Sequence, residues 1–115
     1  MTPKELIAVP TEGDRGIRDR VSGIFAKAPF FTFVEVIDSQ SGEIIVHEND
    51  ASKLAQGTGP IVMKNLKDRG VDVVLASDVG PGAKTMMDMS GIRLWKIEAG
   101  TKVSEAISRY IESQA

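Results

Sequence analysis

The sequence predicts an α/β domain in which helices pack on a five-stranded mixed sheet. A mostly apolar strand at 71–76 runs straight into a glycine-rich turn and a helix over 81–90, as in a β-α-β crossover. Two runs rich in β-branched and aromatic residues, 30–38 and 43–48, flank polar turn residues at 39–42 and predict a β-hairpin. Together these segments require both parallel and antiparallel strand pairs.

The first half of the chain supplies the remaining strand and a long connection. The short apolar run 6–9, ended by Pro10, predicts a buried first strand. Residues 11–29 then predict a loop with one helical turn around 21–26. The hairpin turn is expected at 39–42, where Gly42 is able to take a positive φ. A polar loop, with a short turn at 51–55, leads to the first helix.

The second half predicts two crossovers and a closing helix. Helix 60–69 is expected to start with Pro60 at its first position and to end at Gly70. Strand 92–97 alternates, with one face more polar, and is expected near a sheet edge. Thr101 is a candidate N-cap for the last helix. The inward face of that helix is predicted from residues at helical spacing: Val103, Ala106, Ile107, Tyr110 and Ile111.

Length and composition set the limits on function. A chain of 115 residues predicts one domain, 1–115, and its formal net charge of -2 disfavours broad nucleic-acid binding. There are no cysteines, so neither disulfides nor thiolate metal ligands are available. The N-terminus does not resemble a signal peptide, and no segment has the length needed to span a membrane. A soluble, cytoplasmic protein is therefore expected.

Two glycine turns, each opening a predicted helix, are the best candidate binding site. Backbone N–H groups at a helix N-terminus attract anions, and glycine lets a ligand approach the backbone closely. Neither turn matches a dinucleotide-binding or phosphate-loop motif. The structural alternative is a tight strand-to-helix turn and an ordinary helix start. The first turn comprises Gly57, Thr58, Gly59 and Pro60; the second comprises Asp78, Val79, Gly80, Pro81 and Gly82.

Other polar or soft side chains have two interpretations each. The basic residues of the long loop form either one side of an anion site or a solvated, charge-mixed loop: Arg15, Arg18, Arg20 and Lys27. The methionines form either a soft copper(I) site or core packing, which we favour: Met63, Met86, Met87 and Met89. His47, with Glu48 and Asp50, forms either a weak metal site or an ordinary strand surface, which we favour.

A catalytic set is not visible in the sequence. Asp72 and Asp78 bracket the 71–76 strand without a third carboxylate partner for a two-metal site. There is no cysteine nucleophile, no nucleophile-elbow motif and a single histidine. We therefore expect a binding protein and not an enzyme.

The motifs, taken in order, resemble those of the dinitrogenase iron-molybdenum cofactor biosynthesis family. The resemblance covers about residues 6–111, and its most specific part is the segment from Gly70 to Ala83, GVDVVLASDVGPGA. Supporting segments are IAVP from Ile7, VSGIFAKAPFF from Val21, GTGP from Gly57 and GIRLW from Gly91. The resemblance implies a ribonuclease-H-like fold with sheet order 3-2-1-4-5 and an antiparallel strand 2.

The same resemblance implies a non-enzymatic role. Family members bind, carry or insert an iron-molybdenum cofactor or related metal-sulfur cluster, alongside cofactor-assembly proteins. Many have histidine where Ile24 stands, and a second one near Lys53, so no side-chain metal ligand carries over. What carries over is the backbone of both glycine turns with Ser22 and Phe25 of the long loop. A regulatory or interaction module that has lost metal binding is the alternative.

Overall fold

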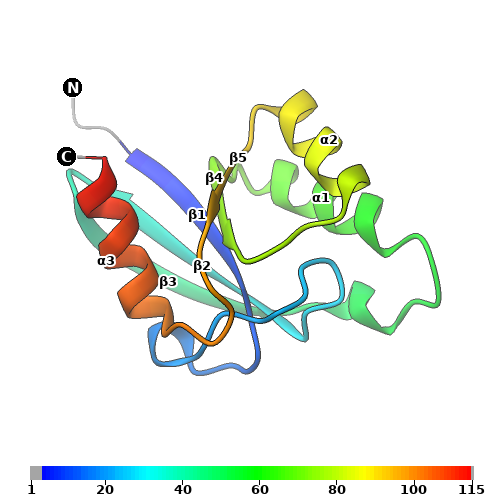
Figure 1. Ribbon diagram of the computed structural model, residues 1–115, viewed down its shortest axis with the longest axis horizontal. Helices are drawn as coiled ribbons and strands as arrows, with labels where there is room; N and C mark the ends of the chain where they lie inside the picture. Colours follow the sequence, from blue (N-terminus) through cyan, green and yellow to red (C-terminus); the bar gives the residue numbers. More distant parts are fainter. Residues whose placement is uncertain (1–3, 115) are drawn as a thin grey trace.

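The structure, a computed structural model, describes residues 4–114 and consists of a mixed sheet with helices on both faces (Figure 1). Two of its elements, η1 and η2, are short 3-10 helices. In chain order the elements are β1 (Lys4–Thr11), η1 (Gly16–Arg18), β2 (Phe30–Ile37), β3 (Gln40–Glu48), η2 (Asp50–Lys53), α1 (Thr58–Asp68), β4 (Val73–Ala76), α2 (Pro81–Ser90), β5 (Arg93–Lys96) and α3 (Val103–Ser113).

The sheet has the strand order β3-β2-β1-β4-β5, as predicted. Strand β2 is antiparallel to both β1 and β3, whereas β4 is parallel to β1 and β5. Because β3 therefore runs in the same direction as β4, the carboxyl ends of both strands lie at the same edge of the sheet. The segments that lead to α1 and α2 leave the sheet from that edge.

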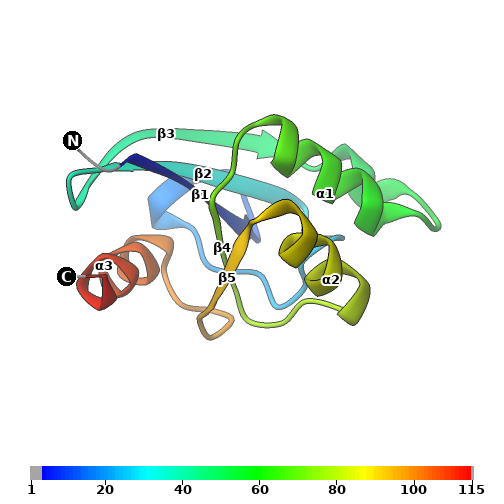
Figure 2. The ribbon, with the colours of Figure 1, turned by 90° about the horizontal axis from the view of Figure 1, so that it is seen from above.

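Alternating residues of the central strands divide the core into two halves. In β1, Ala8 belongs to the cluster under α1 and α2, whereas Ile7 and Val9 belong to the cluster under α3. Figure 2 shows α3 on the face of the sheet opposite α1 and α2. None of the helices in the described part of the chain combines the length and apolar composition needed to cross a lipid bilayer.

The hairpin turn lies earlier than predicted. Asp38 and Ser39 take positive φ values, 55° and 65°, and β3 begins at Gln40, so the turn does not use the positive φ that Gly42 is able to take. Gly42 instead lies within β3, opposite the register shift between Val34 and Val36. A two-residue turn with two positive φ values matches the twist of the paired strands, which explains why it forms.

The helix starts that were predicted from Pro60 and from Thr101 both differ from the structure. Helix α1 begins at Thr58, so Pro60 is its third residue; proline is tolerated there because first-turn N–H groups lack intrahelical partners. Helix α3 has Lys102 and not Thr101 at its N-cap, without a side-chain cap. Its Val103 N–H donates to the Asp19 carbonyl at 2.9 Å, so the long loop takes the role of a cap.

The long loop contains its helical turn at η1, and the turn expected around 21–26 is wrong. Arg15 and Arg20 backbone N–H groups donate to the Asp19 carboxylate at 3.0 and 2.8 Å, which folds the loop tightly around Asp19. Val21 then pairs with Thr11 in an isolated β-bridge, so this part of the loop is extended. The hydrogen bonds to the Asp19 carboxylate and the bridge between Thr11 and Val21 set the conformation of the loop. The local sequence alone did not predict this conformation.

Candidate functional site: paired glycine turns

Helices α1 and α2 pack against each other and begin at the same end of the molecule (Figures 1 and 2). Strand β4 ends at Ala76 and leads through the second glycine turn into α2, which begins at Pro81. The first turn follows β3 and η2 and has Gly57 as the N-cap of α1. The two helix dipoles therefore present their positive ends to the same side of the domain.

The fold itself does not explain every glycine of the turns. Gly57 has φ 78°, a conformation that other residues adopt only with strain. Gly80, however, has φ -64° and ψ 159°, which suits any residue. A methyl group added at Gly80 or Gly82 would meet no atom within 4 Å. Neither backbone strain nor packing requires these two glycines, and they leave the backbone of the turn open.

The hydrogen-bond donors that remain free at these two helix starts are a small set of backbone N–H groups. The N–H groups of a first helical turn lack partners within the helix, and no side chain caps α1 or α2. Pro60 and Pro81 have no N–H, so the remaining first-turn donors are concentrated on a few residues. These donors are the N–H groups of Thr58, Gly59, Gly82 and Ala83. Such an arrangement is suited to an anion and not to a cation.

Thr58 adds an unsatisfied polar atom to the first turn. Its side chain is buried, and Oγ1 has no hydrogen-bond partner in residues 4–114. A buried hydroxyl without a partner is costly, and such groups are uncommon in native structures. The neighbouring Gly59 is half-buried, and a methyl group there would lie 4.0 Å from Met86 Cε of α2. The start of α1 therefore lies close to α2.

Asp78 is an exposed carboxylate within the second turn. Its charge would repel an anion bound to the adjacent N–H groups unless the side chain turns to solvent. Asp78 would therefore not contribute binding energy to an anionic ligand.

The structure places the other two predicted site residues in the interior. Ser22 is buried, and its Oγ accepts a hydrogen bond from the Ile24 N–H at 3.2 Å. Phe25 is 4% exposed and packs edge-to-face on Phe31, with ring centroids 5.6 Å apart. Both residues shape the long loop, and neither brings an exposed atom to the glycine turns.

The basic residues of the long loop separate into two groups. Arg15 lies 3.6 Å from the Asp19 carboxylate, and Arg20 donates to the Gly100 carbonyl at 2.8 Å, both near the start of α3. Lys27 instead donates to the Leu54 carbonyl at 3.0 Å, in the loop that leads to Gly57. Of these contacts, the Lys27 contact alone brings positive charge to the side of the first glycine turn.

Asn49 is a positioning residue that sequence reasoning missed. Its buried side-chain amide donates to the carbonyls of Ala26 and Ala28, each at 2.8 Å. Its own N–H donates to the Pro29 carbonyl at 2.9 Å. These bonds fix the Phe25–Lys27 part of the loop against the end of β3. The sequence signal for this positioning role was an asparagine directly after a strand, because an asparagine side chain readily forms hydrogen bonds with nearby backbone groups.

The soft and acidic side chains do not assemble into a metal site. No group of three histidine, cysteine or acidic side chains in residues 4–114 is arranged to hold a metal ion. Met63 and Met87 are core residues at 3% and 0% exposure, as the packing interpretation predicted, whereas Met89 is 83% exposed. His47 is an exposed residue of β3. An anion at the glycine turns would therefore be held by backbone groups.

The mixed sheet, with the paired turns at its carboxyl edge, defines an α/β protein. The chain belongs to the dinitrogenase iron-molybdenum cofactor family, whose sequence profile matches residues 4–113. The resemblance found in its motifs is thereby confirmed.

Known structures and sequences are similar to this chain. A protein from Thermotoga described as a putative NifB protein is 34% identical, with a TM-score of 0.76 over 96% of this chain and 90% of the other. The apo orange protein of Desulfovibrio gigas is 28% identical, with a TM-score of 0.82 over 96% and 89%. An uncharacterized protein of Methanocaldococcus jannaschii is 24% identical over 94% of this chain and 86% of its own.

Proposed function

We propose that this protein binds and carries an anionic metal-sulfur cluster, an iron-molybdenum cofactor or a related species, during cofactor assembly. The observation that carries the proposal is the pair of glycine turns, with two uncapped helix N-termini side by side and open space at Gly57, Gly80 and Gly82. Backbone N–H groups and helix dipoles can hold anionic sulfides by hydrogen bonds without displacing the metals' own ligands. The family assignment supports this cargo.

The proposed role is carriage without turnover, in partnership with cofactor-assembly proteins. A carrier must release its cargo, and N–H···S contacts to a few donors are weaker than coordination by thiolates or imidazoles. The lack of a grouped set of metal-binding side chains in residues 4–114 is compatible with such release. If Asp78→Ala abolished a divalent-metal-dependent phosphodiesterase activity of the purified protein, the non-enzymatic role would be wrong.

The test is an anaerobic titration of ¹⁵N-labelled protein with tetrathiomolybdate, an inorganic molybdenum-sulfur anion. We expect the amide resonances of Thr58, Gly59, Gly82 and Ala83 to shift together, and Gly82→Ala to weaken binding by about tenfold through obstruction of the backbone. Gly23→Ala is the matched control, because a methyl group there makes only an ordinary 3.7 Å contact with Ala99. Unmoved glycine amides would refute the assignment of the site.

A second candidate is a regulatory or interaction module of the same fold without metal binding. The same absence of a grouped metal-binding set in the described residues, and of cysteine, favours it. It predicts a complex between metal-free protein and a purified cofactor-assembly protein, seen by size-exclusion chromatography, that Gly82→Ala leaves unchanged. The carrier proposal predicts instead that complex formation depends on the loaded cluster.

A further inference from the structure

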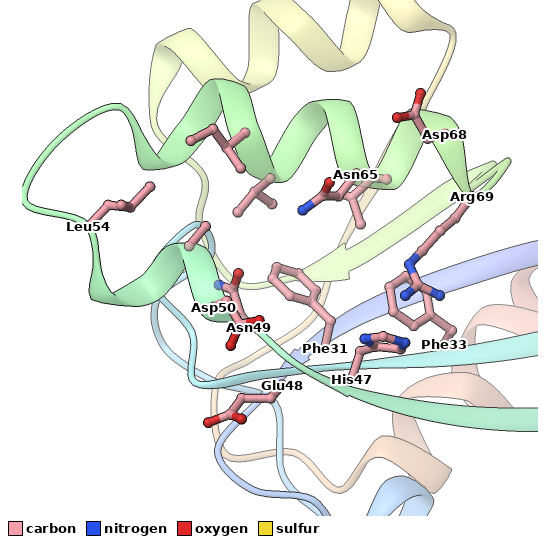
Figure 3. Close-up of a pocket in the computed structure, with 14 residues that line it drawn as sticks. Phe31, Phe33, His47, Glu48, Asn49, Asp50, Leu54, Asn65, Asp68 and Arg69 are labelled. Atoms are coloured by element: carbon pink, nitrogen blue, oxygen red, sulfur yellow. The ribbon is translucent and has the colours of Figure 1, made fainter.

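A separate pocket lies between α1 and the β2–β3 hairpin (Figure 3). Its volume is about 600 Å³, which falls within the usual range for small-molecule sites. Residues of β2, β3, η2 and α1 form its walls, whereas α2 packs elsewhere on α1 (Figure 2). The pocket contains no residue of either glycine turn, so it is independent of the proposed cluster site.

The floor and one end of the pocket are apolar. Phe31 and Phe33 form the floor and are each 4% exposed. Leu54 and Ile61 lie at the far end, where they remain 39% and 44% exposed. Leu54 and Ile61 are large apolar side chains left partly in water, so they gain most from a ligand that covers them.

The other end of the pocket carries hydrogen-bond donors without protein acceptors. The Arg69 guanidinium lies 4.6 Å from the centroid of the Phe33 ring and forms no ion pair within residues 4–114. His47 pairs in register with Phe31, and Figure 3 shows its ring beside Phe33, with Asn65 above them on α1. No hydrogen bond occupies the side chains of His47, Asn65 or Arg69 in the described part of the chain.

The pocket's carboxylates do not neutralise this end. Asp68 is paired with Lys64 at 2.7 Å, and Glu48 lies 3.9 Å from Lys53. Asp50 lies at the opposite end of the pocket from Arg69 (Figure 3). Arg69 and the side chains of His47 and Asn65 thus lie at one end, and Leu54 and Ile61, together with Asp50, lie at the other.

We infer that this pocket binds an amphipathic organic carboxylate. The carboxylate would accept hydrogen bonds from Arg69 and Asn65, with His47 beside it, because a guanidinium fork matches a carboxylate in geometry. The apolar body would lie over Phe31 and reach towards Leu54 and Ile61.

The inference can be tested with two probes that share a body and differ in the head group, 4-phenylbutyrate and 4-phenylbutan-1-ol. Titrated into ¹⁵N-labelled protein, the acid should shift the amides of Phe33, His47, Asn65 and Arg69 and bind at least about tenfold more tightly than the alcohol. Arg69→Gln should remove that preference and leave the affinity for the alcohol unchanged. Ile61→Ser should weaken both probes.

Lys67→Gln is the matched control, because it removes one positive charge from an exposed position of α1 outside the pocket. It should preserve the preference for the acid. Equal loss in Lys67→Gln and Arg69→Gln would show that net charge alone attracts the acid and would overturn the inference. Absence of binding by 4-phenylbutyrate, or shifts confined to Gly57, Gly59, Gly80 and Gly82, would overturn it as well.

Discussion

The two faces of the sheet treat their polar groups in opposite ways. On the α3 face, the Asp19 carboxylate accepts two backbone N–H groups, the Asp19 carbonyl accepts that of Val103, and the buried Tyr110 hydroxyl donates to Glu5 at 2.7 Å. On the α1–α2 face, both helix starts lack side-chain caps, and Thr58 Oγ1 has no partner in the described residues. The first face satisfies these groups within the chain. On the second face the Asn49 amide is also bonded within the chain, but the two helix starts and the Thr58 hydroxyl have no side-chain partner in the described residues.

The largest expected effect comes from a substitution at Asp19, on the α3 face, where the polar groups are hydrogen-bonded within the chain. In Asp19→Asn, an amide NH₂ replaces one acceptor oxygen and faces a backbone N–H, so we expect a loss of about 3 kcal/mol in the free energy of unfolding. Urea denaturation monitored by circular dichroism measures this loss. Asp14→Asn, at an exposed position of the same loop, should change stability by less than about 0.5 kcal/mol. Similar losses in both variants would contradict the role of Asp19.

The charge of Asp19 also predicts an acid dependence. Burial alone would raise the pKa of Asp19, but backbone hydrogen bonds from Arg15 and Arg20 and the charge of Arg15 outweigh it and lower the pKa below 3.8. The carboxylate therefore stabilises the fold above that value, and the contribution is lost as the pH falls through the lowered pKa. Acid titration of stability should show a smaller decrease below pH 3.8 for Asp19→Asn than for the natural chain.

Tyr110 gives the next largest effect. Its hydroxyl donates to Glu5 and accepts from Arg93 Nη2 at 3.2 Å, and Arg93 also contacts Glu5 directly. Tyr110→Phe should lower the free energy of unfolding by about 1.5 kcal/mol, because the partners lose a buried hydrogen bond. Thermal or urea unfolding at neutral pH measures it. Ser108→Ala, on the exposed side of α3, is the control and should be close to neutral.

An alkaline dependence follows from the same group. Burial, and then the hydrogen bond and charge of Glu5, raise the pKa of Tyr110 from 10.0 to about 12. A raised pKa means that the stabilisation is complete below pH 10.0 and is lost as the pH rises towards about 12. Tyr110→Phe should lack this decrease. An identical decrease in the variant would show that another group titrates there.

Thr58→Val tests the difference between the two faces of the sheet by removing a single hydroxyl group. Valine has nearly the shape of threonine but no hydroxyl, so removal of an unsatisfied buried oxygen should stabilise the fold by about 1 kcal/mol. At Thr32, whose buried hydroxyl lies 3.1 Å from that of Thr11, the same substitution should destabilise. Urea unfolding of both variants measures the difference, and the same sign in both would remove the distinction between the faces.

Local sequence predicted the parts of the fold that local interactions determine. The strand-turn-helix run through Gly80, the end of α2 at Gly91 and the apolar face of α3 all arise from neighbours along the chain. The position of both glycine turns was predicted for the same reason. The hairpin turn moved to Asp38 and Ser39 because pairing with β2, and not the glycine, sets the register.

The features that sequence could not predict depend on contacts between distant segments. The Asn49 amide reaches carbonyls 23 and 21 residues away, and Arg69 lies on a phenylalanine of another element. Phe25 was assigned to the candidate site, but an aromatic residue in a loop looks the same whether it lines a ligand site or fills the core. The packing of Phe25 against Phe31 shows that it fills the core.

The smallest expected effect, that of Gly82→Ala, tests most directly why this position on the α1–α2 face carries no side chain. Gly82→Ala should raise stability by about 0.5 kcal/mol, because alanine favours a helix and its methyl group meets no atom within 4 Å. Gly57→Ala should instead lower stability by about 1 kcal/mol, because φ is 78° there. If thermal unfolding shows both signs, and Gly82→Ala also weakens tetrathiomolybdate binding, then Gly82 is retained at a net cost to stability for the sake of a ligand. If Gly82→Ala stabilises the fold and leaves binding intact, the open backbone serves no anion and the carrier proposal loses its main support.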